Sequence, residues 1–320
     1  MALPIPGPTM RAFGEREAIA RLSARLHGGE SVLTGIGDDC AVVAIAGSAF
    51  DWLLTTDPVV ESVHFLPDAA PEGVGHKAAG RVLSDIAACG GAPLWVLFNV
   101  VAPPDYPMTH LERIYDGADG LCARFGAAII GGDLSRGERL ELHAFAVGRV
   151  PRGTAVLRSG ARPGDTLYVT GALGGSLRGH HLTFEPRIAE GQWLAAGRWA
   201  TAMMDLSDGL ASDLRRILEQ SGVGAEIRLE AIPISDDARA MSESENEALR
   251  RALCDGEDFE LLFSVPADRR AAFEQAWNAT FPLACTAIGV VTEEAGAFLV
   301  RRADGAVHSY EQYGYEHFRD

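Results

Sequence analysis

The sequence predicts a two-domain α/β protein, and three observations support this. Its 320 residues exceed one ordinary hydrophobic core, because single domains usually hold about 50–200 residues. Strand-like apolar runs alternate with segments of helical periodicity along both halves, the pattern of α/β folds. Hydrophobic residues make up 47% and charged residues 22%, as in globular proteins. We expect a tail at 1–12, an N-terminal domain at 13–150 and a C-terminal domain at 151–320.

In the N-terminal half, helices are predicted where apolar residues recur every three to four positions, and strands where apolar runs are short. The helical segments are 13–26, 75–90 and 109–125. The strand segments are 41–45, 52–57, 94–101, 127–130 and 140–150. Pro58 should end the second strand because proline interrupts a hydrogen-bonded ladder. Alternation along that strand places Thr55 and Asp57 on one face and Thr56 on the other.

In the C-terminal half, a polar connector at 158–165 leads into further strands and helices. The predicted strands are 166–170, 261–263, 284–291 and 298–302. Helices are predicted after Leu210 and around 273–277 by their apolar spacing. The glycine-rich turn at 171–175 matches neither the P-loop nor the dinucleotide-binding fingerprint, since G-K-[ST] and G-x-G-x-x-G are absent.

Acidic residues recur in short glycine-bearing turns beside these strands. The first turn, Gly35–Cys40, carries Asp38 and Asp39 side by side. Two such charges about 4 Å apart repel by roughly 4 kcal/mol at an effective dielectric near 20, whereas a divalent cation turns them into ligands. The later acidic turns carry Asp133, Asp205, Asp208, Asp255 and Glu257. Glycine amides in such turns also face phosphate groups.

Each of these features also has a purely structural explanation. Acidic turns are common on surfaces, Asp85 has the spacing for an i,i+4 ion pair with Arg81, and Ser207 or Asp208 can cap a helix. Because acidic residues recur in several glycine-bearing turns, we favour the functional explanation, in which they bind cations. All-oxygen sites select Mg²⁺ or Ca²⁺, and several carboxylate-bound Mg²⁺ ions beside glycine turns indicate ATP-dependent phosphoryl transfer.

Composition excludes several other classes of protein. The net charge of −16 argues against a nucleic-acid partner. The longest apolar run, 94–102, is too short to span a membrane, and the first residues lack the features of a signal peptide. The five cysteines are scattered, which is typical of free thiols in a reducing compartment. We therefore expect a cytoplasmic protein.

The motifs, taken in order, resemble those of the thiamine-monophosphate kinase family, within the aminoimidazole ribonucleotide synthetase-like superfamily. The matching motifs are Gly35-Ile-Gly-Asp-Asp-Cys40, Thr55-Thr-Asp57, Val63-His-Phe65, Leu83-Ser-Asp-Ile-Ala-Ala88, Gly131-Gly-Asp133, Arg158-Ser-Gly160, Pro163-Gly-Asp165, Asp205-Leu-Ser-Asp-Gly-Leu210 and Gly256-Glu-Asp-Phe-Glu260. The resemblance extends from about residue 13 to Gly314-Tyr-Glu-His-Phe318, nearly the full length.

The resemblance implies a two-domain fold of the aminoimidazole ribonucleotide synthetase type, with the N-terminal sheets of two chains paired in a homodimer. It also implies that ATP and several Mg²⁺ ions bind, and that the γ-phosphoryl group passes directly to thiamine monophosphate to give thiamine diphosphate. The acceptor oxygen is already largely ionised at neutral pH. No general base, and hence no catalytic acid–base residue, is expected.

Roles for individual residues follow from the same resemblance. The implied Mg²⁺ ligands are Asp39, Thr55, Thr56, Asp57, Asp85, Asp133, Asp205 and Asp208. The implied ATP contacts are Tyr115, Gly132, Asp133, Arg158 and Ser207. The implied thiamine contacts are His64, Glu257 and an aromatic residue of the tail, for which we select Tyr313.

Three departures from the family pattern bear on the substrate's fit. Asp255 and Ser62 stand where glycines are usual, and the segment 175–186 is shorter than usual. Two alternatives therefore stay open beside the kinase: a superfamily ATPase that acts on another acceptor, and a non-catalytic nucleotide-binding relative. The intact acidic turns argue against the second, because a protein without catalysis has no need of such repulsive clusters.

Overall fold

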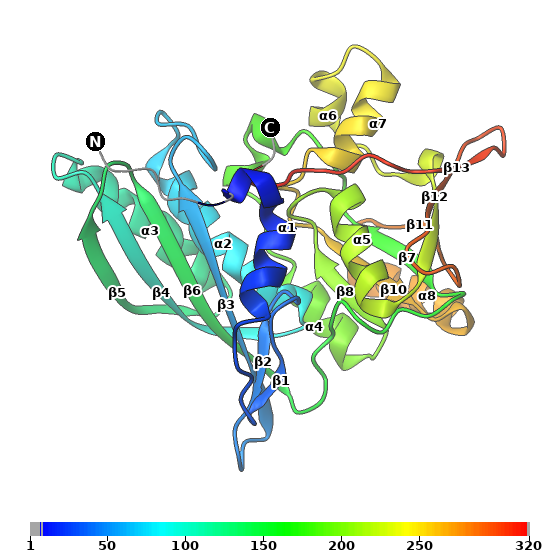
Figure 1. The fold of residues 1–320 in the computed structure, drawn as a ribbon, viewed down its shortest axis with the longest axis horizontal. Helices are drawn as coiled ribbons and strands as arrows, with labels where there is room; N and C mark the ends of the chain where they lie inside the picture. Colours follow the sequence, from blue (N-terminus) through cyan, green and yellow to red (C-terminus); the bar gives the residue numbers. More distant parts are fainter. Residues whose placement is uncertain (1–6, 8, 319–320) are drawn as a thin grey trace.

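The computed structural model describes residue 7 and residues 9–318, and it contains two α/β halves, each built on its own sheet (Figure 1). The predicted fold class is confirmed. Helix α1 (Met10–Ser23) begins within the predicted tail 1–12, three residues before the predicted start. Residues 1–6 and 8 of that tail lie outside the described residues. Within the described chain, every helix is too short or too polar to cross a membrane.

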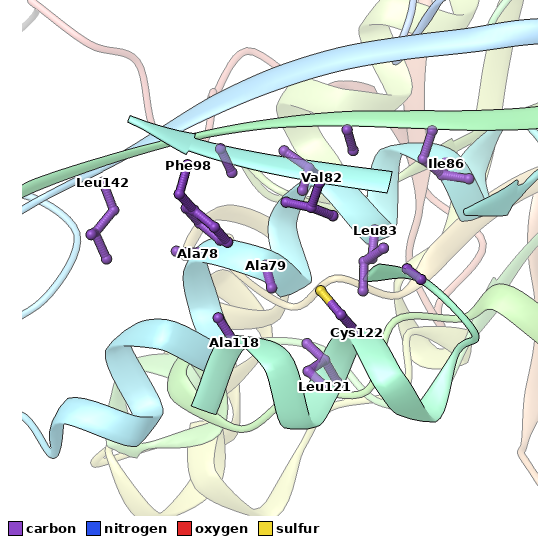
Figure 2. Packing of buried hydrophobic residues seen from close by; sticks show 14 of the residues in the cluster. Ala78, Ala79, Val82, Leu83, Ile86, Phe98, Ala118, Leu121, Cys122 and Leu142 are labelled. Carbon is purple, nitrogen blue, oxygen red and sulfur yellow. The ribbon is translucent and has the colours of Figure 1, made fainter. Parts of the chain in front are cut away.

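The N-terminal sheet has six strands in the order β1-β2-β3-β6-β4-β5. Their bounds are β1 Val32–Thr34, β2 Ala41–Ala44, β3 Phe50–Val60, β4 Ala92–Ala102, β5 Ala128–Arg136 and β6 Glu141–Pro151. Only the pair β4 and β5 is parallel within this sheet. Helix α2 (Pro71–Ala88) packs against one face, and α3 (Met108–Arg124) packs against α2 (Figure 2).

Alternation along the strands explains how this core forms. Alternate residues of β3, β4 and β6 are buried beneath α2, together with the apolar stripe of the helix. The two helices approach closely because they meet at glycines. A Cβ atom on Gly75 would lie 1.8 Å from the Ile114 oxygen, and one on Gly117 would lie 2.0 Å from the Glu72 oxygen. On the opposite face of this sheet, α1 lines a cleft together with Leu54, Thr56 and Phe145.

The C-terminal sheet has seven strands in the order β13-β12-β9-β11-β7-β10-β8. Their bounds are β7 Thr166–Thr170, β8 Ala202–Asp205, β9 Gly224–Arg228, β10 Leu261–Val265, β11 Cys285–Thr292, β12 Phe298–Arg301 and β13 Val307–Ser309. The helices are α4 Ile188–Ala196, α5 Leu210–Ser221, α6 Asp236–Ala240, α7 Glu245–Cys254 and α8 Arg270–Thr280. Helix α5 buries its apolar stripe against one face, and α8 packs Phe273 and Trp277 against the other.

Two local predictions in the first half are wrong. Strand β3 continues through Pro58, which pairs with His143. The N–H of Val60 donates to His64 rather than to β6, and backbone groups two residues apart in a strand point to the same side, so the Pro58 nitrogen also faces away from β6. On that side β2 pairs with β3 only as far as Leu54, so proline interrupts no ladder hydrogen bond at this position. Likewise 131–133 is not a turn but part of β5, where a register shift interrupts the pairing with β4.

Candidate functional site

Three carboxylates from the two halves meet where the halves join. Asp39 follows the first acidic turn, Asp85 lies in the last turns of α2, and Asp205 ends β8. Each offers one oxygen, and the three oxygens lie within 4.8 Å of one another. Two of these side chains come from the N-terminal half and one from the C-terminal half. The cluster, which we call the acid trio, therefore exists only when the two halves are docked.

Neighbouring side chains hold the acid trio in place. The Thr55 hydroxyl donates to Asp85 Oδ2 at 2.5 Å, and the Ser84 hydroxyl donates to Asp205 Oδ2 at 2.5 Å. The Arg158 guanidinium forms an ion pair with Asp39 Oδ1. Asp39 Oδ2 is buried and has no hydrogen-bond partner. An orphaned carboxylate oxygen inside an all-oxygen cluster fits a hard divalent cation.

The electrostatics of the acid trio agree with that assignment. Burial, followed by the charges of neighbouring aspartates, raises the pKa of Asp205 to about 7. The same causes raise the pKa of Asp85 well above its ordinary value. Asp38, next to the trio, has its pKa raised to about 6, mainly by burial. Its carboxylate accepts the N–H groups of Asp39 (3.0 Å) and Arg158 (3.1 Å), so it orders the backbone beside the ligands.

A second charged network lies beside the trio. Arg81 forms a two-pronged ion pair with Asp57, and its Nη1 lies 3.0 Å from Glu257 Oε1. The predicted alternative of an Asp85–Arg81 pair is therefore not realised. Lys77, which is fully buried, forms an ion pair with Glu257 and donates to the His64 carbonyl at 2.5 Å. Sequence reasoning missed this lysine, although a lysine among the buried residues of a helix was a usable signal.

His64, Arg81 and Glu257 line a pocket at the junction of the halves, which we call the His64 pocket. Its lining residues are Val63, His64, Arg81, Leu177, Ser207, Asp208, Asp255, Glu257, Tyr315 and His317. The pocket thus contains two of the three predicted thiamine contacts. Tyr313 lies elsewhere, with its ring under the guanidinium of Arg215, whose Cζ is 4.2 Å from the ring centroid.

The state of His64 follows from its surroundings. Its Nδ1 accepts the Val60 N–H at 3.0 Å, so the ring proton is on Nε2. Burial, together with the charges of Arg81 and Lys77, lowers the pKa of His64 to about 3. The ring is therefore a neutral hydrogen-bond donor. Glu257 has a φ of 60°, a left-handed conformation that costs a non-glycine residue energy and often marks a functional site.

The acidic turn after β8 places Ser207 and Asp208 at the His64 pocket. Neither side chain caps α5, because the N-cap is Gly209, so the predicted capping alternative is wrong. Asp208 forms an ion pair with Arg216, and its N–H donates to Asp213 at 3.0 Å.

Next to the trio, a separate cleft opens between α1 and β3. It is lined in part by Gly37, Asp38, Asp39, Thr55, Thr56, Arg158 and Arg216. The Thr56 hydroxyl donates to the Ala144 carbonyl at 2.8 Å. As predicted, Thr55 and Asp57 share one face of β3, where they contact α2, while Thr56 lies on the other.

The remaining predicted ATP and metal residues lie apart. Tyr115, Gly132 and Asp133 line a hollow between α3 and the edge strand β5. In register across the sheet, Asp57 pairs with Ala144, Ala144 with Phe98, and Phe98 with Gly132. Three strand spacings of about 4.8 Å separate the two groups by about 14 Å. Within one chain, Asp133 therefore does not join the acid trio.

The shortened segment 175–186 is firmly packed against the site. Its Phe184 ring stacks on Phe259 with centroids 3.9 Å apart, directly beyond the Glu257 turn. A Cβ atom on Gly80 of α2 would lie 2.6 Å from the Phe184 ring. The Ser176 hydroxyl donates to the buried Asp258 carboxylate at 2.6 Å. The short segment thus joins α2 to the wall of the His64 pocket.

Comparisons with known proteins agree with this architecture. The family model described as AIR synthase related protein, N-terminal domain, matches residues 37–150, and that for the C-terminal domain matches 170–301. The thiamine-monophosphate kinase of Salmonella typhimurium is 38% identical over 332 residues, covering 96% of this chain and 99% of that protein. The Bacillus subtilis enzyme of the same name is 32% identical, covering 95% and 99%. A solved structure, AaThiL complexed with AMPPCP and TMP, superimposes with a TM-score of 0.84 at 32% identity, covering 97% and 99%.

Proposed function

The chain belongs to the thiamine-monophosphate kinase family, and we propose that it transfers the γ-phosphoryl group of ATP to thiamine monophosphate, giving thiamine diphosphate and ADP. The observation that carries this proposal is the acid trio of Asp39, Asp85 and Asp205, closed by contacts between the two halves. The near full-length similarity to kinases of this name supports the choice of substrate. The solved relative binds AMPPCP and TMP, which supports ATP as the donor.

The residues of the site explain how transfer proceeds without a general base. Mg²⁺, which we propose the acid trio holds with Asp39 Oδ2 among its ligands, neutralises and aligns phosphate oxygens when bound. The acceptor phosphate already carries a nucleophilic oxygen, so no side chain has to remove a proton. Arg158 lines the cleft beside the trio and is placed to contact ATP phosphates. Thr55 and Ser84 orient two of the three carboxylates.

The His64 pocket is the site we assign to the thiamine moiety. Neutral His64 offers its Nε2–H, and Glu257 offers a carboxylate that Lys77 holds in place. A cationic thiazolium ring binds favourably beside carboxylates and over aromatic faces. Because Tyr315 lines this pocket and Tyr313 does not, we now assign the aromatic contact to Tyr315. Asp255 adds a further negative charge to the pocket wall.

We propose that the active form is a homodimer built on the open face of the N-terminal sheet. That face partly exposes Trp52, Leu54, Trp95, Leu97, Phe145 and Val147. Exposed contiguous apolar surface of this kind indicates an interface. Pairing of two such faces would bring Tyr115, Gly132 and Asp133 of one copy toward the Asp39 cleft of the other, completing the predicted set of ATP contacts.

Mixing inactive variants tests this arrangement. Asp39→Asn and Asp133→Asn should each abolish transfer and leave the fold intact. After the two are unfolded together and refolded, half of the dimers are mixed and each mixed dimer has one intact site, so about a quarter of the activity should return. Activity that stays absent in a mixture shown to contain mixed dimers would contradict sites shared between copies.

The overall function has a direct test. Purified protein is incubated with ATP, Mg²⁺ and thiamine monophosphate, and thiamine diphosphate and ADP are measured by chromatography. The proposal expects the two products in equal amounts. ADP without thiamine diphosphate would indicate an ATPase with another acceptor, and no ADP at all would indicate a non-catalytic nucleotide-binding protein.

The five cysteines are free thiols, which supports our placement of the protein in the cytoplasm.

A further inference from the structure

Arg81 connects the metal-binding side of the site with the His64 pocket. Its Nε and Nη2 lie 2.7 and 2.8 Å from the two carboxylate oxygens of Asp57, and its Nη1 lies 3.0 Å from Glu257. The side chain is only 12% exposed. Asp57 shares a face of β3 with Thr55, whose hydroxyl donates to Asp85 of the acid trio, so Asp57 lies beside the trio. One guanidinium therefore spans both parts of the site.

The charge of the His64 pocket makes this position significant. Among the described residues that line it, three are carboxylates: Asp208, Asp255 and Glu257. Arg81 is the only lysine or arginine in the described lining, and His64 is neutral. The charged groups that a phosphate monoester meets in this pocket are therefore three carboxylates and one guanidinium, and the guanidinium of Arg81 lies at the end that contacts Asp57.

We propose that Arg81 binds the phosphate group of the acceptor, and that it reaches this position by exchanging its partner Asp57 for the phosphate when a divalent cation takes the Asp57 carboxylate. The proposal rests on the proposed function, because it concerns a phosphorylated acceptor in the His64 pocket. It assigns a role to a residue outside the motifs on which the kinase resemblance was based.

Three physical arguments support the exchange. A buried guanidinium that loses its carboxylate needs another anion, because an unpaired buried charge is strongly unfavourable. Phosphate accepts two parallel N–H bonds from arginine, just as Asp57 does here. Glu257 would keep its ion pair with Lys77 after Arg81 moves, so the exchange leaves no second charge unpaired.

The size of the pocket also indicates that its wall moves. The cavity measures about 130 Å³, whereas ligand sites usually hold about 300 Å³ or more. The contact between Arg81 and Glu257 joins two lining residues from different halves of the chain, so releasing it would open the pocket toward the acid trio. The acceptor phosphate would then face the cation-binding carboxylates.

The test compares two ligands that differ only by the phosphate. Binding of thiamine monophosphate and of unphosphorylated thiamine is measured by calorimetry in the presence of Mg²⁺ and AMPPCP, with which no turnover occurs. Arg81→Met should weaken binding of thiamine monophosphate about 10- to 100-fold and change binding of thiamine by less than about threefold. Arg81→Lys, which keeps a charge but loses the two-pronged geometry, should give an intermediate loss for the phosphorylated ligand.

Arg301→Met is the matched control, because Arg301 makes the same kind of two-pronged ion pair with Glu226 in the C-terminal sheet. It should leave the binding of both ligands unchanged. Thermal unfolding checks each variant, and if Arg81→Met does not fold, Arg81→Lys carries the comparison. Equal weakening of both ligands, or no weakening of either, would overturn the proposal. Failure of the proposed function is a separate result, namely that the unsubstituted protein makes no thiamine diphosphate.

Discussion

Replacing Asp205 with asparagine should stabilise the metal-free protein while it removes the response to Mg²⁺. In the folded chain, burial and the neighbouring aspartates raise the pKa of Asp205 from 3.8 to about 7. A raised pKa of this kind means that the folded state holds a proton that the unfolded state has released. Its stabilising contribution is complete below about pH 4 and is lost as the pH rises through about 7.

The size of the effect follows from that shift. Each pKa unit corresponds to about 1.4 kcal/mol, so a shift of about three units corresponds to about 4 kcal/mol lost by the metal-free protein at about pH 8. Asparagine cannot ionise and still accepts the hydrogen bond from Ser84. The variant should therefore be up to about 4 kcal/mol more stable than the unsubstituted protein at about pH 8, and the difference should shrink toward pH 4.

The assay is urea unfolding at several pH values, with EDTA or with Mg²⁺. Mg²⁺ should stabilise the unsubstituted protein at about pH 8, because it binds the folded carboxylates, and should not stabilise Asp205→Asn. Asp165→Asn is the control: Asp165 is buried but accepts bonds from Thr201 (2.6 Å) and from the Arg162 N–H (3.0 Å). It should lower stability by about 1–3 kcal/mol and keep the Mg²⁺ response. If Asp205→Asn behaves like Asp165→Asn, the acid trio is not a cation site.

Three further predictions concern packing and assembly. Gly132→Ala would place its Cβ 1.7 Å from the Phe98 carbonyl oxygen, so thermal unfolding should show a marked loss of stability. An unchanged melting temperature would mean that β4 and β5 pair differently. Phe184→Ala should lower the free energy of unfolding, measured by urea denaturation, by about 3–5 kcal/mol, because it removes the ring stacked on Phe259. A loss below about 1 kcal/mol would show that the two rings are loosely packed. Trp95→Glu places a charge on the open sheet face and should convert the dimer to a monomer in sedimentation analysis; a persistent dimer would place the interface elsewhere.

Local sequence patterns were sufficient for most of the elements, because the spacing of apolar residues reports which face of a helix or strand is buried. They failed where tertiary context decided. Pro58 stays within β3 because, among the residues that the structure describes, no strand pairs on that side beyond Leu54. Residues 131–133 extend β5 because β4 supplies a partner there, with a bulge that accommodates the glycines. Neither condition can be read from the segment itself.

The acidic motifs identified the candidate site in advance, since repulsive carboxylates in glycine-bearing turns point to cations wherever they lie. The motifs did not reveal which of these acidic residues lie close together in space. Asp133 follows glycines in the same kind of sequence motif as Asp39, yet within one chain it lies about three strands away from Asp57, about 14 Å. The choice between Tyr313 and Tyr315 depended on how the tail packs, and the structure places only Tyr315 in the His64 pocket.

By itself, the sequence determined the family and the fold class, and it predicted oxygen-ligand chemistry, because each depends on residue types at local spacings. Only the tertiary structure decided which of these residues lie together. Asp205 meets Asp39 and Asp85, and Lys77 and Arg81 reach Glu257, across the contact between two halves. Such contacts join residues more than a hundred positions apart, and their geometry depends on how two packed cores dock rather than on any local pattern.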